Sequence, residues 1–284
     1  MKGNGNKGEV RFDNVTVQFG EEIAPSVVLK DCNFTVEKGK FNTLVGASGC
    51  GKSTLINVVA GYEHPTTGLV LMDGEKITGP AKDRLVVFQE TSLFPWMTVM
   101  ENILFGPSVQ DVDKREAREK AEALLRKVAL QDFADKYPIQ LSGGMQRRAE
   151  LARALINNPK VMLMDEPFRG LDAMTRQLMQ EYAAGLFEET GITQLFVTSE
   201  LEEAIFLGDK IYILSCRPSR VIKIIDVNLP RPRDYSMMTG SDYKRIKLEA
   251  FELLYEEAKK SFAAGGMASA DLVEAFDKRK DNMM

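Results

Sequence analysis

The sequence predicts an α/β fold in which helices cover both faces of a mostly parallel sheet. Strand-like and helix-like segments alternate along much of the chain, as they do in proteins built on parallel sheets. Residues 161–164 are all apolar, which is typical of a strand buried inside such a sheet. A glycine-rich loop at 46–54 lies between a strand-like and a helix-like segment, the context in which phosphate-binding loops occur.

The individual elements follow from the periodicity of the apolar residues. Alternation and short apolar runs predict strands at 9–19, 27–29, 32–36, 41–45, 68–72, 84–88, 161–164, 195–198 and 211–214. Helical spacing predicts helices at 55–60, 113–130, 142–156, 171–189, 201–206 and 242–262. Asp113 and Ser142 are residue types that cap helix N-termini, so each is expected to begin the helix that follows it.

The domain organisation is predicted from where this alternation is interrupted. Residues of about 90–158 are mainly helical, which predicts a helical subdomain inserted into an α/β core spanning 9–228. Residues 1–8 are polar and glycine-rich and are expected to be flexible. Residues 229–284 are expected to form a C-terminal extension that holds an amphipathic helix at about 242–262 and a loosely held tail after Gly265.

Composition narrows the class of protein. The chain of 284 residues is 44% apolar and 27% charged, as ordinary globular proteins are. Its formal net charge of −4 argues against a dominant basic surface for nucleic acid, and no nucleic-acid partner is expected. Cys32, Cys50 and Cys216 lack the spacing of a metal site and are expected to be reduced thiols. No apolar run reaches the length of a membrane span, so a membrane role would depend on a partner.

The loop at 46–54 fits the phosphate-binding pattern G-x-x-x-x-G-K-[ST], the P-loop. Its glycines allow successive backbone N–H groups to point at one anion. Lys52 can reach the outer phosphates of a nucleotide, and the Ser53 hydroxyl can bind Mg²⁺. The candidate nucleotide-binding residues are therefore Gly46, Ala47, Ser48, Gly49, Cys50, Gly51, Lys52, Ser53 and Thr54.

Two carboxylates end the apolar strand predicted at 161–164. Ligands bind at the carboxyl ends of parallel strands, so Asp165 and Glu166 are expected to face the phosphates. Asp165 is a candidate ligand for Mg²⁺, and Glu166 is a candidate catalytic residue that orients and polarises the attacking water.

A second anion-binding helix start is predicted at 141–148, which reads LSGGMQRR. Ser142 caps the helix, and Gly143 and Gly144 leave its first N–H groups accessible to a phosphate. Two such helix starts in one chain suggest that ATP is bound between two copies, with one start from each.

These motifs, in this order, resemble the nucleotide-binding subunit of an ABC transporter over about residues 9–228. The resemblance implies a P-loop NTPase core with an N-terminal antiparallel β subdomain, an inserted helical subdomain, and ATP and Mg²⁺ as cofactors. It implies that Gln89 contacts Mg²⁺ and the attacking water, and that Asp172 crosses the interface of an ATPase dimer. Phe19 lies where the family places an aromatic residue that stacks on adenine, although an edge-strand core position explains it as well.

The segments 93–99 and 217–220, followed by 229–234, resemble the branch of importers for nitrate, taurine, sulfonates and similar anions. That branch implies transmembrane permease subunits, a second ATP-binding subunit and, indirectly, a solute-binding protein as partners. It places the chain on the cytoplasmic face of the inner membrane as a peripheral subunit. In that branch, selectivity for the transported solute lies in the membrane and solute-binding subunits.

One position departs from the family. A histidine that contacts the γ-phosphate normally follows the strand predicted at 195–198, and here Ser199 replaces it. Serine can donate one hydrogen bond but cannot carry a positive charge, so slow hydrolysis is expected at this chain's own P-loop site. The sequence leaves open a homodimer, a heterodimer with a catalytically complete subunit, and a nucleotide-gated subunit with little turnover. Soluble ABC ATPases of DNA repair and translation fit less well, because no long coiled coil separates Gln89 from 141 and only one such domain is present.

Overall fold

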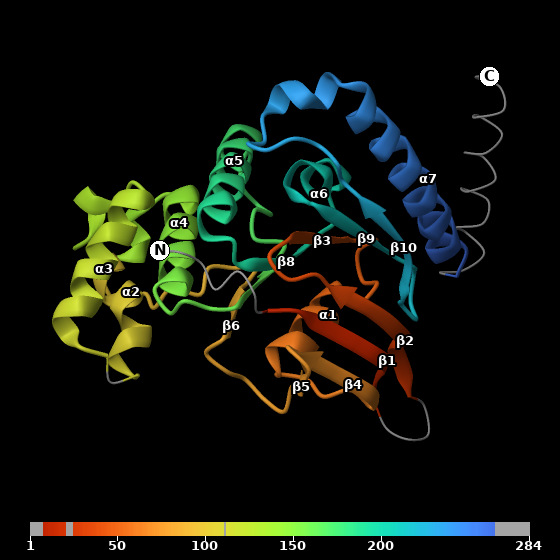
Figure 1. The fold of residues 1–284 in the computed structure, drawn as a ribbon, viewed down its shortest axis with the longest axis horizontal. Coiled ribbons are helices and arrows are strands. Elements are labelled where there is room, and N and C mark those ends of the chain that lie inside the picture. The colour runs from red at the N-terminus through yellow and green to blue at the C-terminus, as the bar shows by residue number, and fades with distance from the viewer. Residues whose placement is uncertain (1–7, 21–24, 111, 265–284) are drawn as a thin grey trace.

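Two sheets of different character form the body of the molecule (Figure 1). The computed structural model describes residues 8–20, 25–110 and 112–264. The larger sheet has the strand order β10-β9-β3-β8-β7-β6, and all of its neighbouring pairs are parallel except β9 with β10. Its strands are β3 (Phe41–Val45), β6 (Arg84–Val87), β7 (Val161–Asp165), β8 (Thr193–Thr198), β9 (Lys210–Leu214) and β10 (Val221–Asp226). The predicted α/β fold is confirmed.

The larger sheet is covered by helices on both faces because its strands are apolar on both sides. In β8, Leu195 and Val197 join the core around helix α1 (Lys52–Ala60), whereas Phe196 lies in the core around α5 (Ala173–Thr190). Helix α6 (Leu201–Leu207) lies on the same face as α5 and supplies Phe206 and Leu207 to that core.

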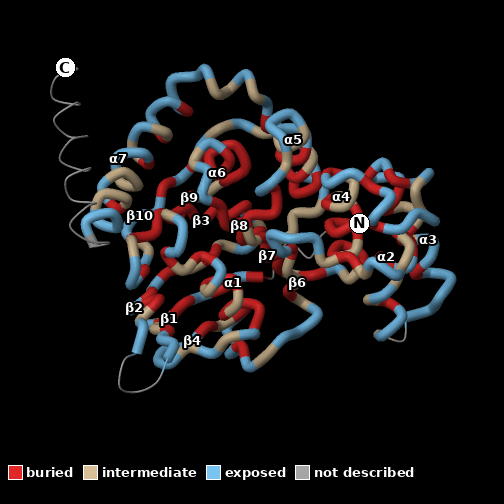
Figure 2. The backbone as a smooth tube through the Cα atoms, turned by 180° about the vertical axis from the view of Figure 1, so that it is seen from behind, coloured by how far each residue is buried: buried red, intermediate tan, exposed pale blue. Residues whose placement is uncertain are grey.

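The smaller sheet is antiparallel and packs against α1 from the other side. It has the order β2-β1-β4-β5, with β1 (Val10–Phe19), β2 (Ser26–Val36), β4 (Thr67–Met72) and β5 (Glu75–Lys76). Alternating residues of β1, among them Val10 and Phe12, face the core that this sheet shares with α1. The burial pattern is drawn in Figure 2, where buried residues lie in the strands around α1 and also in α4, α5 and α6.

Three helices lie between β6 and β7 in the sequence and are gathered at one side of the molecule, beyond the edge strand β6 (Figure 1). They are α2 (Val99–Ser108), α3 (Lys114–Lys127) and α4 (Gly143–Leu155), with short 3₁₀ turns at Gln131–Phe133 and Pro138–Gln140. Asp113 caps α3 as predicted, since its carboxylate accepts a hydrogen bond from the Glu116 N–H at 2.9 Å. The side chains between these helices are apolar, and they join one core with α5.

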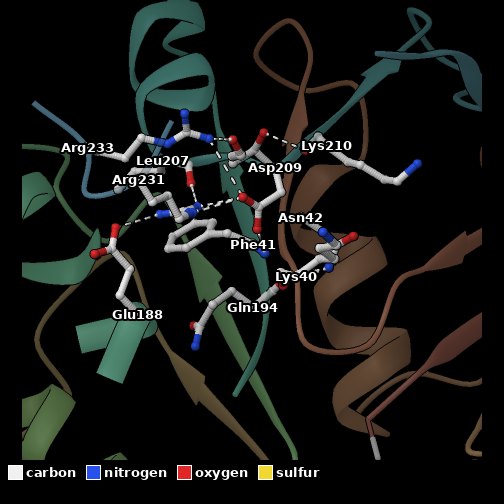
Figure 3. Close-up of polar contacts among 12 residues, drawn as sticks. Lys40, Phe41, Asn42, Glu188, Gln194, Leu207, Asp209, Lys210, Arg231 and Arg233 are labelled. Carbon is white, nitrogen blue, oxygen red and sulfur yellow. Dashed lines mark hydrogen bonds and ion pairs between the residues drawn. The ribbon is translucent and has the colours of Figure 1, made fainter. Parts of the chain in front are cut away.

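The C-terminal part begins with a polar clamp that is drawn in Figure 3. Arg231 donates to the Asp209 carboxylate at 3.0 Å and lies 3.3 Å from the Glu188 carboxylate. The buried Arg233 donates to the carbonyl of Gly208 at 2.7 Å, with the Asp209 carboxylate 3.7 Å away. Asp209 also accepts from the backbone N–H of Phe41 at 2.8 Å, so the clamp fixes the extension to the first residue of β3.

After this clamp, a 3₁₀ turn at Tyr235–Thr239 leads into α7 (Ser241–Ala264), which runs along the side of the molecule that carries α6 and β10 (Figure 1). Tyr243, Ile246 and Ala250 on its inner face are buried in a third core with α6 and β9. No helix in the described part of the chain has both the length and the apolar character that crossing a bilayer requires.

Several sequence-based predictions of elements need correction. The strands expected at 27–29 and 32–36 are one strand, β2. Asp31 adopts φ +49° between them, but the pairing of β2 with β1 continues on both sides of it. Strands β5 and β10 and helix α2 were not predicted. Gly8, expected to be flexible, is buried, and its N–H donates to the Asp73 carboxylate at 2.7 Å. Residues 1–7 and the tail after Gly265 lie outside the described residues.

Candidate functional site

The P-loop runs from the end of β3 into the first turn of α1. Gly49 and Gly51 have φ of +77° and +108°, a region that side chains with a Cβ rarely adopt. A Cβ at Gly51 would also lie 2.9 Å from the side chain of Val28, and one at Gly46 would lie 2.7 Å from the Cys50 sulfur. The glycines are therefore required both for the turn and for the close approach of β2. Gly46 to Gly51 form the loop, and Lys52, Ser53 and Thr54 begin α1.

Lys52 is the cation at the centre of the site. Its side chain is buried, and Nζ donates to the backbone carbonyls of Gly46 and Ala47 at 3.0 and 3.1 Å. The same Nζ lies 3.3 Å from Oε1 of Glu166. The ammonium group is thus held inside the loop that the sequence predicts to surround a phosphate.

Glu166 lies one residue past β7 and has φ +43°, a strained backbone conformation of the kind that is concentrated at functional sites. Its N–H donates to the carbonyl of Val197 at 2.9 Å, because β7 and β8 are paired in parallel. This pairing also brings Ser199, which follows β8, next to Glu166, and its hydroxyl donates to Oε1 at 2.6 Å. The predicted catalytic glutamate and the residue that replaces the family histidine are therefore in direct contact.

Arg169 is a further contact of Glu166 that the sequence reasoning missed. Its Nη1 lies 2.9 Å from Oε2 of Glu166. Burial opposes ionisation of Glu166, but the hydrogen bond from Ser199 and the charges of Lys52 and Arg169 outweigh it, so the pKa of Glu166 lies below its usual value. The signal available in the sequence was an arginine three residues after Glu166, within reach across one turn of backbone.

Asp165 and Ser53, the predicted Mg²⁺ ligands, lie next to each other, close enough for the Ser53 hydroxyl to stabilise the Asp165 carboxylate. Burial raises the pKa of Asp165, and the nearby carboxylate of Glu166 also raises it, although the Ser53 hydrogen bond and Lys52 oppose this. A buried carboxylate beside a hydroxyl is the kind of oxygen donor set that Mg²⁺ binds, so the two residues fit the ion. The third predicted ligand, Gln89, is exposed, and in the described residues no hydrogen bond joins its side chain to Ser53 or Asp165.

The loop that holds Gln89 is attached to α4 by its backbone. Arg147 is buried and donates to the carbonyl of Phe88 at 2.7 Å and also to that of Gln89. The guanidinium is neutralised by Glu150, 2.6 Å away, whose other oxygen accepts from the N–H of Ser92 at 2.5 Å. Arg147 belongs to the LSGGMQRR motif. The motif was recognised in the sequence, but this role of Arg147 was not predicted.

Ser142 caps α4 as predicted, since its hydroxyl accepts from the N–H of Met145 at 3.4 Å. Ser142 and Gly143 are exposed, whereas Gly144 is buried, and a Cβ there would lie 2.9 Å from the side chain of Thr175. Within the described chain, no hydrogen bond or ion pair joins this helix start to Lys52 or its loop. A single protomer therefore does not bring the two predicted phosphate-binding helix starts together.

Asp172 and Phe19 also lie at the surface. Asp172 caps α5, and its carboxylate accepts from the N–H of Thr175 at 3.0 Å. The hydroxyl of Thr175, and after it this N–H, lower the pKa of Asp172. Phe19 is the last residue of β1 and is 39% exposed, so it is not a core residue.

A hollow of about 200 Å³ lies beside the Ser199–Glu166 contact. The residues around it come from the P-loop, the segments after β7 and β8, α5 and α6, and they include Ser48, Glu166, Arg169, Arg176, Ser199 and Glu203. The hollow is therefore bounded by cations and carboxylates on the side of the P-loop where the outer phosphates of a nucleotide are expected.

The family model described as ABC transporter matches residues 29–169. The aliphatic sulfonates import ATP-binding protein SsuB of Bacillus cereus is 40% identical over 243 residues, which cover 86% of this chain and 96% of that protein. An ABC transporter ATP-binding protein of Methanocaldococcus jannaschii is 39% identical over 255 residues, covering 90% of this chain and 94% of the relative.

Solved structures agree with this assignment. A dimeric ATP-binding cassette in a post-hydrolysis state, bound to ADP and Pi, is 31% identical with a TM-score of 0.67, covering 78% of this chain and all of that one. The cbiO1 subunit of Clostridium perfringens shares the fold with a TM-score of 0.70 at 22% identity, over 87% of this chain and 97% of that one. The chain belongs to the ABC transporter family, as an ATP-binding subunit that hydrolyses ATP to drive transport.

Proposed function

We propose that this chain is the energy-coupling subunit of an importer that takes up a small, anionic solute through separate membrane subunits. The support is its similarity to an aliphatic sulfonates import protein, together with the segments 93–99, 217–220 and 229–234. In this role it is a peripheral subunit on the cytoplasmic face of the membrane, and a separate solute-binding protein delivers the anion. Trp96, which is 70% exposed, is then available for contact with a permease subunit.

The contact cluster of Lys52, Glu166 and Ser199 is the observation that carries the proposed chemistry. Lys52 binds the outer phosphates of ATP, and Glu166 orients the attacking water and accepts its proton. Mg²⁺, when bound by Ser53 and Asp165, neutralises negative charge on the phosphates. We expect Gln89 to contact the ion and the water from the loop that Arg147 attaches to α4.

The second half of each ATP site comes from another ATP-binding subunit, identical or homologous. Its Ser142, Gly143 and Gly144 bind the phosphates from the opposite side. Phe19 of the subunit that supplies the P-loop stacks on the adenine. Asp172 contacts the partner across the interface. The exposure of Ser142 and Asp172 in the single protomer is consistent with this arrangement.

Turnover at this site is slow because Ser199 has one hydroxyl proton, and that proton is donated to Glu166. Serine therefore cannot at the same time donate to the γ-phosphate as the family histidine does. Loss of one positioned donor can reduce the rate by a factor on the order of 10²–10³. The same observation favours a second candidate function, in which this chain is a nucleotide-gated subunit paired with a catalytically complete ATPase subunit.

The proposed site is tested with Lys52→Ala and with Lys223→Ala as the matched control, because Lys223 forms an exposed ion pair with Glu249 at 3.4 Å. We expect Lys52→Ala to weaken ATP binding, measured by equilibrium dialysis, by at least about tenfold, since a buried cation is lost. Lys223→Ala should bind ATP as the unmodified chain does. Equal affinity for both variants would overturn the proposed P-loop site.

The two candidate functions are separated by measuring turnover. In the assembled complex, an importer subunit with its own slow site hydrolyses ATP, and Glu166→Gln abolishes that hydrolysis. A gated subunit binds ATP but leaves the hydrolysis rate of the complex unchanged when Glu166→Gln is introduced. Uptake of labelled sulfonate, nitrate and a neutral sugar by the complex in vesicles then tests the anionic solute.

A further inference from the structure

We propose that Arg169 is a positioning residue that holds the Glu166 carboxylate for hydrolysis, as a second anchor beside Ser199. This inference rests on the proposed function of Glu166. The observation behind it is that Arg169 contacts the carboxylate oxygen that the other two partners leave free.

The two oxygens of Glu166 have different partners in the described chain. Oε1 accepts from Ser199 at 2.6 Å and lies 3.3 Å from Nζ of Lys52. Oε2 contacts Nη1 of Arg169 at 2.9 Å. Two anchors on different oxygens fix the plane of a carboxylate, whose terminal torsion otherwise has a broad energy minimum.

ATP binding is expected to remove one of these partners. The P-loop lysine binds the outer phosphates when a nucleotide is present, so Lys52 exchanges its contact with Glu166 for a stronger one. Ser199 then remains on Oε1, and Arg169 is the only cation that still contacts the carboxylate among the described residues. Without Arg169, the carboxylate would be free to rotate about a single hydrogen bond.

The backbone already holds Arg169 in place for this contact. Its N–H donates to the carbonyl of Glu166 at 3.1 Å, which closes a turn and directs the side chain back over the glutamate. The Arg169 side chain is 59% exposed, whereas that of Glu166 is only 11% exposed. Because solvent screens the charge of the exposed arginine, the expected effect of the contact is on the orientation of Glu166 rather than on folding.

The test compares Arg169→Ala, Arg169→Lys and Arg169→Met with the matched control Arg245→Ala. Arg245 forms an exposed ion pair with Asp242 across the same three-residue spacing, at 3.6 Å, and lies on α7. Steady-state hydrolysis, which gives kcat, and the ATP dissociation constant are measured for each variant in the assembled complex. We expect Arg169→Ala and Arg169→Met to lower kcat about tenfold, because an anchored base is lost, while the dissociation constant changes less than twofold. Arg169→Lys should recover part of kcat, since a cation is restored.

Two outcomes would overturn the inference. If kcat of Arg169→Ala stays within twofold of the unmodified chain or rises, Arg169 does not position Glu166. If the affinity for ATP falls in parallel with kcat, Arg169 acts in binding or folding instead. Glu166→Gln is measured alongside, because retention of hydrolysis in that variant contradicts the proposed role of Glu166 itself, whatever the arginine variants do. Should Arg169→Ala be unstable by thermal melting, Arg169→Met decides, since it keeps the aliphatic stem.

Discussion

The guanidinium of Arg147 lies 2.6 Å from the carboxylate of Glu150, and both side chains are buried within α4. Because the same guanidinium donates to the backbone carbonyls of Phe88 and Gln89, this ion pair attaches the loop after β6 to the helix that begins with Ser142. A displacement of either segment is therefore expected to move the other. The contact gives a physical route between a predicted water-sensing residue and the predicted dimer-facing helix start.

Arg147→Met tests this ion pair. The substitution leaves Glu150 buried without its cation, and breaking one side of a buried pair costs about 3–5 kcal/mol. Denaturant unfolding should show this loss. The matched control is Arg245→Met, whose exposed pair with Asp242 should cost less than about 1 kcal/mol. Similar losses in both variants would mean that the buried pair contributes no more than a surface pair.

Ser199→His tests whether the serine limits turnover. The hollow of about 200 Å³ beside Ser199 offers room for an imidazole ring. A histidine there can donate toward the γ-phosphate, so we expect ATP hydrolysis by the assembled complex to rise by roughly tenfold or more. Ser199→Ala is the control and should not raise the rate, because it removes the hydrogen bond to Glu166 and adds no donor. An unchanged rate with histidine would show that another step is limiting.

Asp209→Ala tests the clamp between the core and the C-terminal extension. Burial, and the charge of Arg231, lower the pKa of Arg233 to about 10, and the Asp209 carboxylate opposes this shift. Removing that carboxylate leaves Arg233 buried beside a second cation, so we expect a loss of about 3–5 kcal/mol in unfolding free energy. Asp226→Ala, which removes an exposed partner of Lys210, is the control and should cost less than about 1 kcal/mol. A loss for Asp209→Ala as small as that of the control would contradict the clamp.

Local chemistry explains which parts of the fold could be predicted from the sequence. The α/β class was predictable because strands such as β7 are largely apolar. The cap of α3 was predictable because Asp113 accepts a hydrogen bond from a residue only three positions further along the chain. Helix α2 was missed although Thr98 and Glu101 form a capping box, since Gly106 and Pro107 break the helical pattern. Apolar and polar residues alternate only weakly in strand β10. The strand is fixed by its pairing with β9, and a local sequence pattern does not reveal that pairing.

The candidate site was also predictable only in part. Contacts between Lys52, Glu166 and Ser199 depend on β3, β7 and β8 being neighbours in a parallel sheet, and the motif order predicts that arrangement. The roles of Arg147 and Arg169 depend on rotamers and on the path of a loop, which spacing along the chain does not determine. The second half of the site could not be placed at all, because it requires another protomer.

Glu203 gives a prediction for the pH dependence of stability. It is buried on α6, and burial raises its pKa above the usual value of 4.5, although hydrogen bonds from Thr198 and from Gln180 at 2.8 Å and the charge of Arg176 oppose this. The carboxylate of Glu200 adds to the increase. The folded state therefore holds this proton more tightly than the unfolded state does.

The sign of the effect follows from linkage. Below the unfolded pKa both states are protonated, and as pH rises from about 4 toward the raised folded pKa the unfolded chain ionises first, so stability is lost over that window. Glu203→Gln removes the titration but keeps an oxygen that can accept from Gln180, so its advantage over the unmodified chain should grow from acidic to neutral pH. Glu202→Gln on the exposed side of α6 is the control and should track the unmodified chain, as measured by urea unfolding across that range. Parallel curves for Glu203→Gln and the unmodified chain would mean that the buried carboxyl carries no shifted pKa, and that Thr198 and Gln180 together solvate its charge fully.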